Sequence, residues 1–157
     1  LRKQLSSAIQ AVGVFVDEEP EQVAALLEAG VIDLAQLHGR EDEDYLKRLR
    51  ALTGKPIIQA FPVKTPTDLE RAQSSSADYI LLDSGAGTGI PFDWALLTSV
   101  RRPYFLAGGL GPDNVAQAIR FLHPWGVDVS SGIETGGMKD FHKMAAFVAA
   151  VRKEEKV

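Results

Sequence analysis

The feature that most constrains the fold of this chain is a regular alternation of short apolar runs with helix-like segments. Six runs rich in branched and aromatic residues end every 21 to 25 residues along the sequence. They are Ala11–Val16, Ile32–Leu37, Pro56–Phe61, Tyr79–Asp83, Pro103–Gly108 and Gly126–Ser130. Several of them lack polar alternation, which is typical of parallel strands covered on both faces. We therefore predict an α/β fold built on a parallel sheet.

The segments between these runs carry apolar residues at helical spacing, and we predict that the apolar faces pack into the core. The clearest faces are Tyr45–Leu46–Leu49–Leu52, Val115–Ala118–Ile119–Leu122 and Phe141–Met144–Ala145–Val148. Thr67 and Glu70 fit a capping box at the start of a further helix, with Pro66 just ahead of it.

The even repeat is compatible with a doubly wound sheet, but an eight-unit (βα)8 TIM barrel fits it better. Such a barrel normally needs about 200 to 250 residues, whereas the chain has 157. Two further units at the same repeat would add about 46 residues. The chain begins at Leu1, and its first ten residues read like the end of a helix. We expect one barrel domain over residues 1–157, incomplete and covering about units three to eight.

Composition and charge narrow the classes of function. The net charge of −4 speaks against nucleic acid or an anionic membrane as the partner. Because there is no cysteine, these residues hold no disulfide, no thiolate nucleophile and no Cys-ligated zinc. The three histidines and the scattered acids form no convincing metal site. We expect a cytoplasmic protein without a metal site.

Glycines and serines follow the last two predicted strands. Gly108 and Gly109 come after one strand, and Ser130, Ser131 and Gly132 come at the end of the next. If these are strands seven and eight of a barrel, they occupy its usual phosphate site. Glycine lets backbone N–H groups approach an anion closely, and serine adds hydroxyl donors. Tight turns also use glycine for steric reasons alone, so the phosphate site is a hypothesis.

Other polar residues follow the remaining strands. Asp83 ends the fourth run, before a glycine-rich loop, and is either a helix cap, a partner for a basic residue or a general acid. Asp128 alternates with Ser130 and is predicted to face the same ligand. Gln36 and His38 lie at the end of the second run, and His38 fits a structural role as well as a ligand contact.

Taken together, five ordered motifs resemble the phosphoribosylanthranilate isomerase family of tryptophan biosynthesis. The motifs are AVGVFVDEEP, AQLHG, LLDSGAGTGIPFDW, LAGGLGPDNV and VDVSSGIETGGMKD. The resemblance implies an isomerase that performs an Amadori rearrangement without a cofactor. It also implies that Asp83 is the general acid, that Asp128 contacts the anthranilate amine, and that the GGL and SSG loops hold the phosphate. The glycine-rich loop after Asp83 is expected to fold over the substrate.

The family's general base is a cysteine, and an arginine helps to hold the anthranilate carboxylate; this sequence has neither motif. We expect residues that precede Leu1, or a symmetry-related chain, to supply what is missing. Two alternatives stay open: another phosphate-binding barrel isomerase or lyase, against which FDW and VDVSSG argue, and a non-catalytic phosphate-binding fragment. In each case the expected partner is a phosphorylated small molecule, and the protein is expected to be a monomer or a homodimer.

Overall fold

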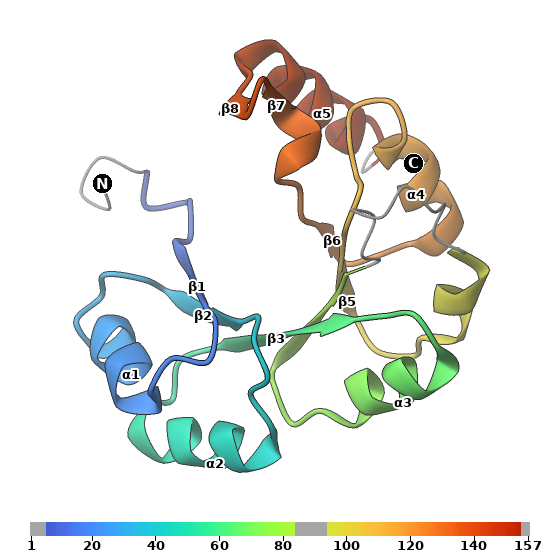
Figure 1. The fold of residues 1–157 in the computed structure, drawn as a ribbon. Coiled ribbons are helices and arrows are strands. Elements are labelled where there is room, and N and C mark those ends of the chain that lie inside the picture. The colour runs from blue at the N-terminus through green and yellow to red at the C-terminus, as the bar shows by residue number, and fades with distance from the viewer. Residues whose placement is uncertain (1–5, 84–93, 155–157) are drawn as a thin grey trace. The chain divides into compact units, whose positions relative to one another are not determined.

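A six-stranded sheet organises the computed structural model, which describes residues 6–83 and 94–154 (Figure 1). The strands are hydrogen-bonded to their neighbours in chain order, without a crossover. They are β1 (Val12–Phe15), β2 (Leu34–Leu37), β3 (Ile57–Pro62), β4 (Tyr79–Asp83), β5 (Tyr104–Ala107) and β6 (Gly126–Val127). All six predicted strands are therefore present, which confirms the α/β fold.

The strand order distinguishes between the two architectures that the sequence allowed. β1–β2, β2–β3 and β5–β6 pair in parallel, with Val12 opposite Leu34 and Ala35 opposite Ile57. A doubly wound sheet reverses its strand order at a switch point, whereas successive units of a barrel add strands in one direction only. The unbroken order from β1 to β6 is that of a barrel. Its numbering as units three to eight stays a prediction.

Helices occupy the connections between the strands. They are α1 (Pro20–Glu28), α2 (Glu43–Leu52), α3 (Pro66–Ser74), α4 (Val115–Leu122) and α5 (Phe141–Glu154), with short 3-10 helices η3 (Trp94–Ser99) and η4 (Ser131–Ile133). A small hairpin, β7 (Glu134–Thr135) and β8 (Met138–Lys139), precedes α5.

The predicted capping box of α3 is wrong by two residues. The helix begins at Pro66, and the residue before it, Thr65, exchanges hydrogen bonds with Asp68. The Asp68 carboxylate also accepts the backbone N–H of Thr65 at 2.9 Å. Proline at the first helical position needs no hydrogen-bond partner for a backbone N–H, so Thr65 and Asp68 fit the helix start better than the predicted Thr67–Glu70 pair.

The chain divides into two compact units, residues 1–61 with 74–81 and residues 62–73 with 82–157. The core of the first unit lies between α1, α2 and the strands β2 and β3. It contains Val23, Ala24, Leu27, Ala35, Leu37, Leu46, Leu49, Ile57 and Ala77. Whether residues 1–157 form a single domain stays a prediction.

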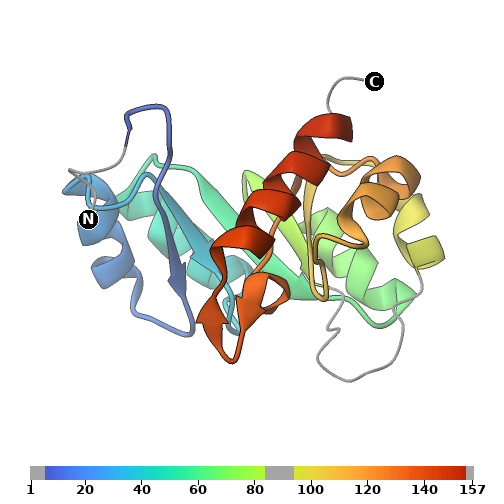
Figure 2. The ribbon, with the colours of Figure 1, turned by 90° about the horizontal axis from the view of Figure 1, so that it is seen from above.

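The second unit contains β5, β6, α4 and α5, and both views show α4 and α5 side by side (Figure 2). Its strands and helices bury Leu82, Leu97, Leu106, Val115, Ala118 and Phe147. Arg120 of α4 and Glu154 of α5 join the two helices by an ion pair of 2.6 Å. This unit carries the predicted phosphate loops.

The apolar face predicted for the last helix is mostly exposed. Phe141 is 76% exposed, and Met144 and Val148 of the same face are 42% and 45% exposed, whereas the neighbouring Phe147 is buried. The prediction that this face packs into the core is therefore wrong for the described residues. Helical spacing reveals where apolar side chains gather, but it does not reveal what covers them.

Candidate active site

The loop after β5 requires glycine at two successive positions. Gly108 has φ 89° and Gly109 has φ 63°, both in the left-handed region that side chains disfavour. Asn114 then fixes the loop: its Oδ1 accepts the backbone N–H of Gly111 at 2.8 Å, and its Nδ2 donates to the Gly109 carbonyl at 3.0 Å. Successive backbone units in such turns form concave sites that accept anions.

The loop after β6 lies directly against the loop after β5. A Cβ on Gly132 would overlap the carbonyl oxygen of Leu110 and would lie 3.1 Å from the Cα of Gly111. Only glycine fits without a backbone shift at such a contact. The two loops that the sequence analysis singled out are thus neighbours. Ser130, Ser131 and Gly132 are at least partly exposed, so their polar groups can reach a ligand.

Two carboxylates belong to the same unit as these loops. Asp83 ends β4, is partly buried, and its backbone carbonyl accepts the N–H of Val63 at 2.9 Å. Asp128 follows β6, is exposed, and its backbone N–H donates to the carbonyl of Leu106 at 2.8 Å. Because β4, β5 and β6 are successive strands of the sheet, both acids stand at the strand ends that carry the candidate phosphate loops. The loop that follows Asp83, residues 84–93, lies outside the described residues.

Gln36 and His38 stand at the end of β2 in the first unit. The amide nitrogen of Gln36 lies 3.1 Å from Nδ1 of His38, and the backbone N–H of His38 donates to the Phe15 carbonyl at 2.8 Å. Gln36 is buried and His38 is partly exposed. The contact gives His38 a structural partner, and the role of both residues in ligand binding stays a prediction.

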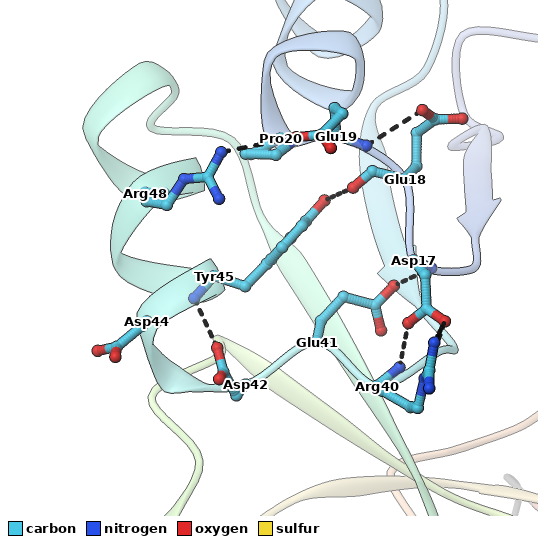
Figure 3. A pocket seen from close by; sticks show the side chains of 10 residues that line it. All are labelled: Asp17, Glu18, Glu19, Pro20, Arg40, Glu41, Asp42, Asp44, Tyr45 and Arg48. Carbon is cyan, nitrogen blue, oxygen red and sulfur yellow. Dashed lines mark hydrogen bonds and ion pairs between the residues drawn. The ribbon is translucent and has the colours of Figure 1, made fainter.

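A pocket that the sequence analysis did not anticipate lies in the first unit, with a volume of about 560 Å³ (Figure 3). Six acidic side chains and two arginines line it, together with Pro20 and Tyr45. Burial raises the pKa of Tyr45 to about 12, and the negative charges of Glu41, Glu18 and Glu19 add to this effect. A pocket with this excess of negative charge disfavours a phosphorylated ligand.

Hydrogen bonds within this pocket explain its shape (Figure 3). Asp17 pairs with Arg40 at 3.0 Å, and the hydrogen bonds from the Arg40 backbone and guanidinium keep the pKa of Asp17 below its usual value. Glu41 accepts the backbone N–H groups of Asp17 and Gly39, each at 2.8 Å. A Cβ on Gly39 would lie 2.5 Å from an Asp17 oxygen. These hydrogen bonds and the ion pair thus join the loop after β1 to the loop after β2.

Within residues 6–83 and 94–154, no group of three or more histidine, cysteine, aspartate or glutamate side chains is arranged to hold a metal ion. Among the helices that the structure describes, none has both the length and the apolar character needed to span a membrane.

The strand order and the polar strand ends define a protein of the (βα)-barrel class. Residues 2–150 match the family model of N-(5'-phosphoribosyl)anthranilate (PRA) isomerase. The chain belongs to this family. The N-(5'-phosphoribosyl)anthranilate isomerase of Endomicrobium trichonymphae is 44% identical over 156 residues, which cover 96% of this chain and 76% of the relative.

Solved structures of the same family share the fold. The crystal structure of phosphoribosyl anthranilate isomerase from Thermotoga maritima matches with a TM-score of 0.85 at 34% identity, covering 96% of this chain and 77% of the other. A phosphoribosyl anthranilate isomerase in complex with reduced 1-(o-carboxyphenylamino)-1-deoxyribulose 5-phosphate matches with a TM-score of 0.82 at 34% identity, covering 96% and 75%.

Proposed function

We propose that this chain forms the larger part of an enzyme that performs the isomerase reaction of its family in tryptophan biosynthesis. The substrate is N-(5-phosphoribosyl)anthranilate, and the product is 1-(2-carboxyphenylamino)-1-deoxyribulose 5-phosphate. The observation that supports the proposal is the close approach of Gly132 to Leu110 and Gly111, because it brings the two candidate phosphate loops together. A solved relative was crystallised with a reduced form of the product, which is itself a phosphate ester.

The proposed roles follow from the chemistry of the rearrangement. The backbone N–H groups of Gly108, Gly109 and the Ser130–Gly132 loop bind the phosphate and so fix the sugar. Asp83 donates a proton to the ring oxygen as the bond from C1 to that oxygen breaks and the nitrogen lone pair forms a C1=N bond. Removal of a proton from C2 then gives an enolamine, and its tautomerisation gives the ketone. Atoms and electrons balance without a cofactor.

The remaining proposed contacts are to the aromatic part of the substrate. Asp128 faces the anthranilate amine, and Gln36 and His38 contribute further contacts. The family's general base is a cysteine, which is not among these 157 residues. We therefore expect these residues alone to bind the substrate without turning it over. Monomeric or homodimeric assembly and a cytoplasmic location belong to the same proposal.

A fluorescence assay that follows the loss of the anthranilate adduct tests the role of Asp83. The chain is joined to the part of the Endomicrobium trichonymphae relative that the alignment leaves uncovered, and Asp83 is replaced by Asn. Because an amide cannot donate the required proton, kcat should fall by about 10² to 10⁴-fold. Binding of inorganic phosphate should be retained. Asp44→Asn, which changes an exposed carboxylate paired with Lys47, is the matched control and should leave kcat unchanged.

The alternative function is phosphate binding without catalysis. Under this alternative the fused protein binds phosphate and the reduced product but has no turnover. Near wild-type turnover in Asp83→Asn would instead contradict the role of Asp83 as general acid.

A further inference from the structure

The β7–β8 hairpin places a lysine behind the loop that follows β6. Nζ of Lys139 lies 3.0 Å from the carbonyl oxygen of Ser130, 3.3 Å from its Oγ and 2.6 Å from a carboxylate oxygen of Glu134. Ser130 and Glu134 flank η4, which spans Ser131–Ile133. One ammonium group therefore connects the two ends of the candidate phosphate loop.

Hydrogen bonds anchor the hairpin to the start of α5, and this anchoring fixes the position of Lys139. The Asp140 carboxylate accepts the hydroxyl of Thr135 at 2.8 Å and the backbone N–H groups of His142 and Lys143 at 2.9 and 3.2 Å. The backbone N–H of Asp140 donates to the Ile133 carbonyl at 2.8 Å. Figure 2 shows the hairpin at the start of α5. The loop is thus held by Lys139 as well as by the contact between Gly132 and the loop after β5.

The chemistry of an ammonium group determines what it does to the serine. Lysine has three N–H donors and no acceptor, so the Ser130 hydroxyl oxygen must accept in this contact. The hydroxyl hydrogen of Ser130 then points away from Lys139 and is available to donate to a ligand. The Glu134 carboxylate at 2.6 Å offsets the charge of the ammonium group, so Lys139 acts on a ligand mainly through the Ser130 hydroxyl.

We propose that Lys139 is a positioning residue of the phosphate site, which orients the Ser130 hydroxyl as a donor and holds η4 in its binding shape. The proposal rests on the proposed function, since it assumes that the Ser130–Gly132 loop binds the phosphate of the substrate. Glu134 supports it by pairing with Lys139, which fixes the ammonium group between its acceptors.

The test measures the affinity of the chain for inorganic phosphate by ³¹P NMR and for the reduced product by calorimetry. Lys139→Met removes the ammonium group and retains most of the side-chain length. Loss of one charge-assisted hydrogen bond predicts about a tenfold weaker affinity for both ligands. Lys143→Met is the matched control: its Nζ donates to the Glu134 carbonyl at 2.6 Å, so it supports the same hairpin without contacting Ser130. It should leave the affinity within about twofold, because no bond to Ser130 is lost.

A double-mutant cycle distinguishes positioning from general support of the fold. If Lys139 acts through the Ser130 hydroxyl, Lys139→Met should weaken phosphate binding much less when Ser130→Ala is already present. Three results would each overturn the proposal. The first is that Lys139→Met and Ser130→Ala lower the phosphate affinity additively. The second is that Lys139→Met and Lys143→Met lower it equally, and the third is that Lys139→Met leaves it unchanged. If the unmodified chain binds neither ligand, the phosphate site of the proposed function fails, and the role of Lys139 fails with it.

Discussion

Replacement of Gly132 by alanine tests whether the two glycine loops form one site. The new Cβ would overlap the Leu110 carbonyl oxygen and would lie 2.9 Å from the Leu110 carbonyl carbon. These are backbone atoms, which cannot rotate aside as a side chain can. One of the two loops must therefore move away from the other.

The size of the effect follows from the cost of inserting one methyl group into close packing, typically about 1 to 3 kcal/mol. If the loops separate in the free protein, the cost appears as a smaller population of the binding arrangement, and Kd rises in proportion. A cost of about 1 kcal/mol corresponds to about a fivefold rise in Kd, and about 3 kcal/mol to about 140-fold. If the loops cannot separate, the same free energy is lost from the stability of the fold.

The assay measures both quantities on the same protein: the Kd for inorganic phosphate and the free energy of unfolding in urea. Their combined loss should amount to about 1 to 3 kcal/mol. Gly54→Ala is the matched control, because a Cβ there meets no atom within 4 Å and its φ lies outside the left-handed region. That variant should be neutral or slightly more stable, by up to about 1 kcal/mol. Unchanged affinity and unchanged stability in Gly132→Ala would refute the close contact of the loops.

Two further predictions concern carboxylates that hold the fold. Hydrogen bonds from the Thr135 hydroxyl, and then from the backbone of Lys143 and His142, keep the pKa of Asp140 below its ordinary 3.8. The Asp140 carboxylate therefore stabilises the fold at pH values above 3.8. This stabilisation is lost as the pH falls through the lower pKa of the folded state. Urea midpoints from pH 6 down to about pH 3 should fall more steeply for the wild type than for Asp140→Asn, and parallel curves would contradict this. Asp78 accepts the backbone N–H of Ile57 at 2.7 Å and pairs with Arg50, so Asp78→Ala should lower the free energy of unfolding by about 1 to 3 kcal/mol. Asp44→Ala, which breaks only the exposed pair with Lys47, should leave the free energy of unfolding nearly unchanged, and equal losses in the two variants would show that the Ile57 contact contributes nothing.

The regular spacing of apolar runs was enough to predict the six strands. The physical reason holds best for β2 and β3, which are buried on both faces and so need an uninterrupted apolar segment, whereas β1 is partly exposed. The run Gly126–Ser130 formed a strand only at Gly126–Val127, and η4 begins soon afterwards at Ser131. The order of the strands in the sheet could be predicted only as a choice between two architectures.

The β7–β8 hairpin was missed although the sequence contains a signal for it. Gly136 and Gly137 have φ 60° and 79°, as a two-residue hairpin turn requires. Its strands have only two residues each, too few to show the alternation by which strands are recognised. Lys139 was overlooked for the same reason, because the hairpin turn is what brings it to Ser130 and Glu134.

The candidate site was predictable where it depends on residue type and not where it depends on contacts. Glycine and serine at two strand ends indicated a phosphate site before the loops were seen to touch. The acidic pocket could not be predicted, because Asp17 and Arg40 are far apart in the sequence and are brought together only by the pairing of β1 with β2.

The conformation of the loop after β5 depends on the chemical state of one side chain, the amide of Asn114. This amide accepts from Gly111 and donates to Gly109, so the loop uses both the oxygen and the nitrogen of this one group. Spontaneous deamidation would replace the donor nitrogen by oxygen and leave a carboxylate facing the Gly109 carbonyl. The same step would add a negative charge beside the candidate phosphate site. If the loop binds phosphate as proposed, a deamidated sample would bind phosphate more weakly while its mass changed by only about one dalton, so an affinity measurement would detect the change when routine purity checks would not.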